Sequence, residues 1–275
     1  MSTPALRPAP TAERWHGAPF VRQVTILTRR QLYAMVHDPG LVVFGLIQPC
    51  VLLFLFTQIF SNIIQTSVLP AGTSYLDFLM PAVLVNHVVQ SSTQSGVGLV
   101  EDLDNGIVSR LRSLPIRPVS MLLARSLADL VRNVVQIVLL LLIALALMGY
   151  APQGGLSGIL VSCALTLFLC WSLSWIFLAI AASTRSAETM NSISVLAVLP
   201  LMFLSSGFVP LQALSPWLAA IAGVNPLTYV IEASRSLAIG SDPGNLVTIA
   251  LFTCLVLAAV GIAGAVRGFR EPVLT

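Results

Sequence analysis

The chain has 275 residues, a formal net charge of +3, a hydrophobic content of 56% and only 9% charged residues. Soluble domains are typically about 45–50% apolar, so this composition excludes an ordinary soluble domain and predicts an all-α integral membrane protein. All fourteen basic residues are arginines. The absence of lysine excludes a P-loop in this chain, because that motif uses a lysine to reach the nucleotide phosphates.

Six apolar stretches are long enough to cross a membrane, since a bilayer core about 30 Å thick needs about 20 mostly apolar residues per helix. In chain order they cover residues 41–60, 75–100, about 121–148, 156–182, 190–208 and 246–266. Pro49 lies inside the first stretch and is expected to kink it. The second stretch is polar or small on almost every side in its latter half, so that half cannot face lipid.

Arginine placement predicts the orientation, because short cytoplasmic loops hold the excess of basic residues. With the N-terminus in the cytoplasm, eleven of the fourteen arginines fall on the cytoplasmic side. Arg125 and Arg132 lie at the cytoplasmic start of the third helix, and Arg235 alone falls outside. We therefore predict cytoplasmic tails at residues 1–18 and 268–275.

Residues 19–38 precede the first crossing and mix apolar Phe20, Val24 and Leu27 with arginines. This pattern is typical of an amphipathic helix that lies in the inner headgroup layer, with its arginines near anionic lipid. An ordinary N-terminal tail is the alternative.

Motifs for catalysis are absent from the sequence: it has no HExxH zinc motif, no nucleophile elbow and no dinucleotide-binding glycine loop. The three histidines are scattered at positions 16, 37 and 87, and the four cysteines lie in separate apolar runs. We expect no catalytic residue, no metal site and no cofactor in this chain, and no nucleic-acid partner.

A polar face follows the second apolar stretch at helical spacing. Its members are His87, Gln90, Ser91, Gln94, Ser95 and Gly98, and Asn86, Ser92 and Thr93 extend the polarity onto adjacent faces. Such a face is costly in hydrocarbon unless it lines water or meets partner groups, which favours a translocation pathway or a subunit interface. The alternative is a tightly packed helix–helix seam. A proton-carrying role for His87 is disfavoured, because no carboxylate within the membrane is evident to complete a relay.

The first cytoplasmic loop, residues 101–120, begins with three acids and then alternates apolar and basic positions. We expect a short surface helix in IVSRLRSL, residues 107–114, which Pro115 ends; the part proposed to couple to a partner is Ser109–Leu114. A new helix should follow, on which Arg125, Asp129 and Arg132 can pair along exposed first turns. The alternative is a solvated basic loop that only fixes the topology.

Three stretches resemble the permease subunits of type-2 ABC exporters: HDPGLVVFGLIQPCVLLFLF, GIVSRLRSLPIRPVSMLLARSLADL and LSSGFVPLQALSPWLAAIAGVNPLTYVIEASR. The third, Leu204 to Arg235, has the family's order of S-G, a hydrophobic residue before proline, a tryptophan after proline, N-P-[LIV]-T-Y and a final arginine. The resemblance covers residues 21–266. Arginine-only composition and short loops are similar to actinobacterial permeases of the daunorubicin-resistance type, which include drug and complex-lipid exporters. The acidic stretch EDLDNG departs from the family by lacking an arginine often found there.

The resemblance implies a six-transmembrane-helix permease domain at residues 39–267, with an amphipathic elbow helix at 19–38. It further implies a coupling helix in the loop 101–120. A broken helical hairpin at 210–240 would re-enter the outer leaflet, and a plain extracellular loop is the alternative there.

The same resemblance assigns two sets of site residues. The ATPase-coupling residues would be Arg110, Leu111, Arg112, Leu114 and Arg117. The hairpin residues would be Pro210, Pro216, Trp217, Asn225, Pro226, Tyr229, Glu232 and Arg235. The prolines would break the hairpin helices, the tryptophan and tyrosine suit the membrane interface, and Glu232 and Arg235 are spaced to pair at i and i+3.

The implied function is export of a hydrophobic drug or lipid across the cytoplasmic membrane of a bacterium. Two separate ABC ATPase subunits would hold the ATP and Mg, so the chain itself is expected not to be an enzyme. It would pair with a second permease, identical or paralogous, and contact membrane lipids and a hydrophobic or amphipathic cargo. The alternative is an ion-coupled secondary transporter, which would normally show buried acids, whereas nearly all eleven acids here lie at predicted helix ends or loops.

The predicted topology places Arg7 and Thr275 on the cytoplasmic side and Leu69 and Gln153 outside. A cysteine substituted at Leu69 should therefore react with a membrane-impermeant maleimide added to intact cells. Labelling of that cysteine from the cytoplasmic side alone would refute the topology.

Overall fold

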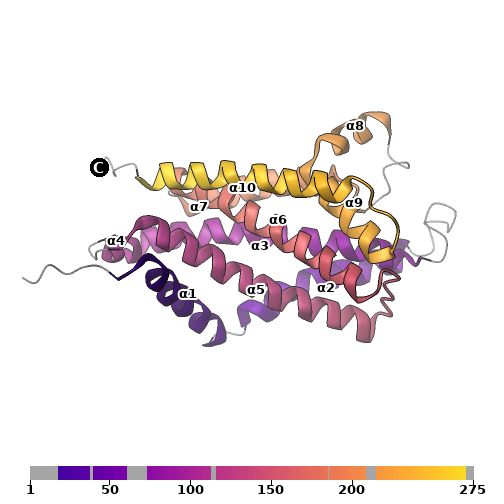
Figure 1. Ribbon diagram of the computed structural model, residues 1–275, viewed down its shortest axis with the longest axis horizontal. Coiled ribbons are helices and arrows are strands. Elements are labelled where there is room, and N and C mark those ends of the chain that lie inside the picture. Colours follow the sequence, from indigo (N-terminus) through magenta and orange to yellow (C-terminus); the bar gives the residue numbers. More distant parts are fainter. Residues whose placement is uncertain are drawn as a thin grey trace, which may run out of the picture.

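The computed structural model describes residues 18–37, 40–60, 73–112, 116–184, 186–208 and 215–270. Their regular structure is helical. The helices are α1 Phe20–His37, α2 Gly40–Phe60, α3 Tyr75–Asp104, α4 Ile107–Arg112, α5 Pro118–Leu147, α6 Gly155–Thr184, α7 Ala187–Phe203, α8 Pro216–Val224, α9 Pro226–Ile239 and α10 Leu246–Arg270. The axes of the long helices are roughly aligned with one another, and α8 projects at the end of the bundle opposite to α4 and the C-terminus (Figure 1).

Four of these helices are long and apolar enough to cross a membrane. Their spans are Val42–Phe60, Pro118–Leu147, Gly155–Thr184 and Leu246–Gly268. By length and composition alone, α7 is too short at 17 residues and α3 is too polar. The structure thus supports four of the six predicted crossings directly.

The predicted fifth stretch, residues 190–208, is too long, because α7 ends at Phe203. Side chains take over the hydrogen bonds of its last turn. The Nδ2 of Asn225 donates to the carbonyl oxygens of Leu201 (2.6 Å) and Leu204 (3.0 Å), and the Ser205 hydroxyl donates to Met202 O (2.7 Å). Such local side-chain bonds compete with helix continuation.

The polar helix α3 lies at the centre of the bundle, with 23 of its 30 residues buried. Helices α2, α5, α6, α7 and α9 all pack against it. The outer face of α2, by contrast, exposes large apolar side chains such as Phe44 and Phe54. The bundle therefore places polarity inside and apolar surface outside, the arrangement that a lipid environment requires.

Helix α1 falls within the predicted segment 19–38 and packs against α5. Leu27 joins a small apolar cluster with Ala124. The Gln23 Oε1 accepts hydrogen bonds from Arg117 N and from the Ser120 hydroxyl, both at 3.1 Å. Arg117 is the N-cap residue of α5 but offers no side-chain cap, so Gln23 satisfies this helix end from another element.

The start of α6 and the end of α9 approach each other at backbone distance. Gly154 N donates to Ala238 O at 2.9 Å. A Cβ atom at Gly158 would overlap the carbonyl oxygen of Leu237, so only glycine fits there. Gly240 ends α9 in the left-handed conformation, with φ 80°.

Gly158→Ala should separate α6 from α9 and lower the stability of the bundle by about 1–3 kcal/mol, the usual cost of overpacking. The measurement is the melting temperature of the purified protein in detergent. Gly223→Ala in α8 is the control, because an added Cβ there meets nothing within 4 Å. Equal melting temperatures for the two variants would contradict the close approach.

Candidate functional site

A cavity of about 280 Å³ lies between α2, α3 and α5. It is lined by Gly45, Gln48, Pro49, Asn86, His87, Gln90, Ser91, Gln94, Arg132 and Gln136. Of the polar residues predicted on α3 as a pathway or interface, Asn86, His87, Gln90, Ser91 and Gln94 line the cavity, whereas Ser95 and Gly98 do not. We call this space the polar cavity.

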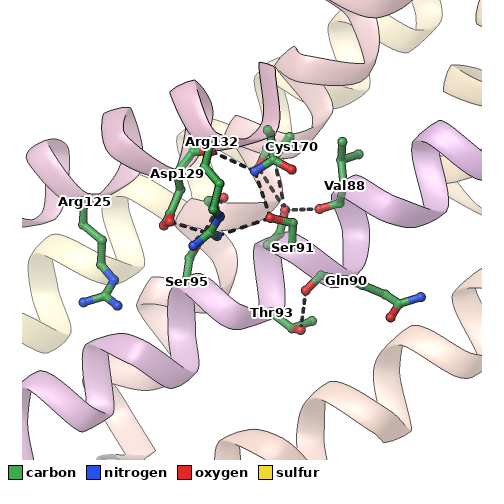
Figure 2. Close-up of polar contacts among 12 residues, drawn as sticks. Val88, Gln90, Ser91, Thr93, Ser95, Arg125, Asp129, Arg132 and Cys170 are labelled. Carbon is green, nitrogen blue, oxygen red and sulfur yellow. Dashed lines mark hydrogen bonds and ion pairs between the residues drawn. The ribbon is translucent and has the colours of Figure 1, made fainter. Parts of the chain in front are cut away.

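Hydrogen bonds between α3 and α5 fix the inner wall of the polar cavity (Figure 2). Asn133 Nδ2 donates to the Ser91 hydroxyl oxygen at 2.8 Å. Arg132 Nη2 donates to the same oxygen at 3.3 Å and pairs with Asp129 Oδ1 at 3.0 Å. Gln90 Nε2 donates to Asn86 Oδ1 at 3.1 Å, so the wall holds its side chains in fixed positions.

Several buried polar atoms around this wall have no hydrogen-bond partner among the described residues. They include His87 Nε2, Gln136 Oε1, Asn133 Oδ1 and Asp129 Oδ2. Buried polar groups are nearly always satisfied in folded proteins, so such atoms call for water or a ligand. Two of them, on His87 and Gln136, belong to residues that line the polar cavity.

The polar cavity opens at the surface of the bundle. Gln48 on α2 and Gln94 on α3 both line it and are both exposed. Gln48 lies within the span Val42–Phe60, whose other exposed residues include Phe44, Ile47 and Val51. The opening is thus a polar notch in an apolar surface.

A second cavity of about 280 Å³ lies between α1, α3, α4 and α5. Its lining includes Arg30, Asp102, Val108, Arg125, Asp129 and Arg132. Arg132 lines both cavities and so separates them. We call this space the elbow cavity.

The predicted pairing of Arg125, Asp129 and Arg132 along exposed turns is wrong in part. Asp129 pairs with Arg132, but Arg125 pairs with Asp102 at the end of α3. The first turns of α5 are largely buried by α1 and α3, and Asp129 is only 7% exposed. Gly98 permits the approach of Arg125, since a Cβ atom there would overlap its guanidinium.

Asp129 is a buried carboxylate that the sequence did not lead us to expect inside the bundle. It is buried and falls inside the span Pro118–Leu147. The sequence placed it near a helix start, where carboxylates are usually solvated. Packing of α1 over that start removes it from water.

The predicted short helix of the first loop is present as α4, Ile107–Arg112, which begins at the first residue of the predicted segment 107–114. Arg110 is exposed on α4 itself, and Arg117 is exposed at the start of α5. Leu114 and the side chains of Leu111 and Arg112 lie outside the described residues. Val108 is buried and lines the elbow cavity, so α4 is seated on the bundle.

The hairpin segment contains two helices, α8 and α9, joined at Asn225. Pro216 and Pro226 occupy their first turns, so these prolines start the helices rather than break them, since proline lacks only an N–H that would be unpaired there. The Asn225 Oδ1 accepts from Leu227 N at 3.0 Å as the N-cap of α9. Trp217 is 64% exposed on α8. Pro210 lies outside the described residues.

Tyr229 helps to close this turn between the two helices. Its hydroxyl donates to Gly223 O at 2.6 Å. The N-P-L-T-Y motif therefore has a structural role: its asparagine caps both α7 and α9, its proline starts α9, and its tyrosine ties α9 to α8.

Arg235 forms the predicted ion pair with Glu232, with Nη1 and Oε1 2.7 Å apart. Unexpectedly, it is only 5% exposed and reaches two other segments. Nε donates to Phe78 O at 3.0 Å, and Nη2 donates to Ser206 O at 2.9 Å and Gly207 O at 3.2 Å. The guanidinium carbon also lies 3.6 Å from the ring centroid of Phe78. One buried arginine thus joins α9, α3 and the end of α7.

Sequence reasoning missed five residues that line the polar cavity: Gly45, Gln48 and Pro49 on α2, and Arg132 and Gln136 on α5. Gln136 is one amide inside an otherwise apolar run, and it lies one helical turn beyond Arg132. That i, i+4 spacing was the available signal. Among the described residues, no group of three or more His, Cys, Asp or Glu side chains is placed to hold a metal ion.

A polar cavity inside a bundle whose outer helix faces are apolar is the arrangement of a multi-pass membrane permease. The chain belongs to the ABC-2 type transporter family, whose profile matches residues 22–239. This confirms the resemblance carried by the motifs of the sequence.

Curated relatives agree with this family assignment. The chain is 29% identical, over 77% of its length and 73% of the relative's, to the daunorubicin resistance ABC transporter permease protein DrrB1 of Streptomyces coeruleorubidus. It is 26% identical over 81% of its length and 76% of the relative's to the putative transport permease ycf38 of Porphyra purpurea. It is 23% identical over 80% of its length and 78% of the relative's to the probable doxorubicin resistance ABC transporter permease protein DrrC of Mycobacterium tuberculosis.

Arg235→Met should destabilise the protein by about 3–5 kcal/mol, because it leaves Glu232 and the buried carbonyl groups of Phe78 and Ser206 without their donor. Thermal unfolding in detergent measures the effect. Arg267→Met, at an exposed position on α10, is the control. The role assigned to Arg235 fails if both variants unfold at the same temperature.

Proposed function

We propose that the chain is the permease subunit of an ABC exporter that moves a hydrophobic or amphipathic drug or lipid out across the cytoplasmic membrane. The observation that carries the proposal is the polar cavity, which opens at Gln48 and Gln94 in a bundle that is otherwise apolar outside. A path for a polar or charged group through a membrane needs such a lining. The drug-resistance names of two relatives support the export direction.

The opening of the polar cavity supports a partnership with a second permease, identical or paralogous. The amides of Gln48 and Gln94 would lose hydrogen bonds against lipid tails. A second subunit that faces this notch would satisfy them and enclose the cavity between two chains. Membrane lipid would contact the remaining apolar surface.

The proposed membrane arrangement is six crossings, α2, α3, α5, α6, α7 and α10, in a bacterial inner membrane. Helix α1 would lie in the inner headgroup layer as an elbow, since Val21 and Val36 remain exposed on it. Helices α8 and α9 would re-enter the outer leaflet, with the exposed Trp217 at the interface. The end of the bundle that holds α4 and the C-terminus would face the cytoplasm (Figure 1).

ATP would be hydrolysed on two separate ATPase subunits, which would hold ATP and Mg, so the permease would not itself be an enzyme. Helix α4 is the proposed coupling helix. Arg110, Arg112 and Arg117 would meet carboxylates of the ATPase, and Leu111 and Leu114 would enter an apolar notch. Closure of the ATPase dimer would then push α4 against α3 and the elbow cavity, which lie behind it.

Ion-coupled secondary transport is the second candidate, and one observation favours it. Asp129 is a buried carboxylate with one oxygen that has no hydrogen-bond partner among the described residues. Its pairing with Arg132 already balances its charge inside the bundle. Transport that continues without any ATPase partner would favour this candidate over the exporter.

Arg112→Glu should break or uncouple the complex, because reversing a charge that is desolvated at an interface costs about 2–5 kcal/mol. The altered permease should still insert, since ten of its eleven cytoplasmic arginines remain. The measurements are copurification of the ATPase and cargo-stimulated ATP hydrolysis.

Arg267→Glu is the matched control, because Arg267 is exposed near the C-terminal end of α10, at the same end of the bundle as α4. It carries the same charge reversal away from α4. Equal ATPase retention and hydrolysis in the two variants would mean that the loop arginine sets topology only.

A further inference from the structure

We infer that the polar cavity takes the headgroup of an anionic, lipid-like amphiphile and that Arg132 selects it by charge. The inference rests on the proposed function and names the cargo class for the same cavity. Among the ten lining residues, Arg132 is the one arginine, and no lining residue is a carboxylate. The other nine are five amide residues, Ser91, His87, a glycine and a proline.

In the ion pair between Arg132 and Asp129, the positively charged member faces the polar cavity. Its partner Asp129 lines the elbow cavity but not the polar cavity. A ligand in the polar cavity therefore meets Arg132, whereas the carboxylate of Asp129 faces the elbow cavity. Figure 2 shows the ion pair between the two side chains. The pair is neutral as a whole, yet it presents a cation to this one space.

Arg132 keeps hydrogen-bonding capacity for a ligand. A guanidinium has five N–H donors in a planar fork that matches phosphate or carboxylate oxygens. The contacts with Asp129 and Ser91 both use Nη2, so Nη1 and Nε have no acceptor within the described part of the chain. The side chain is 24% exposed, so it is accessible to a ligand while partly desolvated.

The other polar atoms suit the uncharged part of such a headgroup. Gln136 Oε1 and His87 Nε2 are buried, and neither has a partner at full hydrogen-bond geometry among the described residues, although the two side chains lie near each other. A hydroxyl of a glycerol or sugar headgroup can donate to both kinds of atom. The amides at the opening, Gln48 and Gln94, offer donors and acceptors to ester oxygens.

The position of the polar cavity favours a headgroup over a compact drug. At about 280 Å³ the cavity is near the lower end of the range for small-ligand pockets, about 300–1,000 Å³, and it opens on an apolar surface. The exposed Phe44, Ile47 and Val51 flank its opening on α2. Acyl chains can therefore stay on this apolar surface while the headgroup enters beside Gln48.

The positive charge of Arg132 determines which ligands the polar cavity prefers. A cationic amphiphile brought near Arg132 would be repelled in the low dielectric of the bundle, and an anionic one attracted. We expect phosphatidylglycerol to bind at least about tenfold more tightly than phosphatidylcholine with the same acyl chains, since the charge difference acts in a partly desolvated site. Doxorubicin, which carries an ammonium group, should bind more weakly than either.

The experiment is native mass spectrometry of the permease purified with its ATPase, titrated with these three probes. Arg132→Gln should reduce phosphatidylglycerol binding about tenfold and leave phosphatidylcholine binding unchanged. Because this variant leaves Asp129 buried without a partner, the double variant D129N/R132Q is the second test. It removes both charges, and it should lose the preference for phosphatidylglycerol in the same way.

Arg30→Gln is the matched control, because Arg30 lines the elbow cavity but not the polar cavity. It should keep full phosphatidylglycerol binding. An equal loss in Arg30→Gln would assign the lipid to the elbow cavity and overturn the inference. Tighter binding of doxorubicin than of phosphatidylglycerol, or an unchanged lipid preference in D129N/R132Q, would overturn it as well.

The experiment distinguishes a failure of the proposed exporter function from a failure of the charge preference. If no ATPase copurifies with the permease, lipid titration of the permease alone still reads the charge preference of the cavity. Loss of ATPase assembly with a retained preference for phosphatidylglycerol would refute the exporter and support the inference. Assembly and ATP hydrolysis without any charge preference would do the reverse.

Discussion

A helix that carries Asn86, His87, Ser91 and Ser92 along its length cannot face hydrocarbon, because each unsatisfied polar group there costs several kcal/mol. The bundle is built around this constraint on α3. Helices α2, α5, α6, α7 and α9 pack against it along the bundle and α4 at one end, and the outward faces of the long helices can then be apolar. Where α2 and α5 leave space beside α3, its polar groups line the polar cavity. The fold and the candidate site are thus two results of one requirement.

The two ends of the bundle are held in different ways. At the hairpin end, Arg235 and Asn225 bind backbone carbonyls of other segments, and α6 touches α9 through glycine. At the other end, α4 and α1 enclose the elbow cavity. One ion pair there, Arg125 with Asp102, joins α5 to α3, and a second, within α5, holds Arg132 at the polar cavity. A movement of α4 would be transmitted through the contacts around the elbow cavity. The contacts of Arg235 and Asn225 would keep the hairpin end in place.

Helix positions and the polar face of α3 were predictable from the sequence, because both depend on residue spacing within one segment. The same is true of the Glu232–Arg235 pair, which spans a single turn. The errors concern contacts across segments. The length of α7 was overestimated because Asn225, some twenty residues later, bonds its last carbonyls. Arg125 was paired within its own helix, whereas its partner lies on α3.

The sequence by itself determined a membrane protein of helices, the location of its polar stripe and its membership of a permease family. Composition, helical period and local motifs carry that information. Only the tertiary structure decided that Gln136 and Arg132 complete the polar cavity and that Asp129 is buried behind it. The reason is that burial and the direction of a charge depend on which helices lie side by side, and residue spacing along one helix does not specify its neighbours.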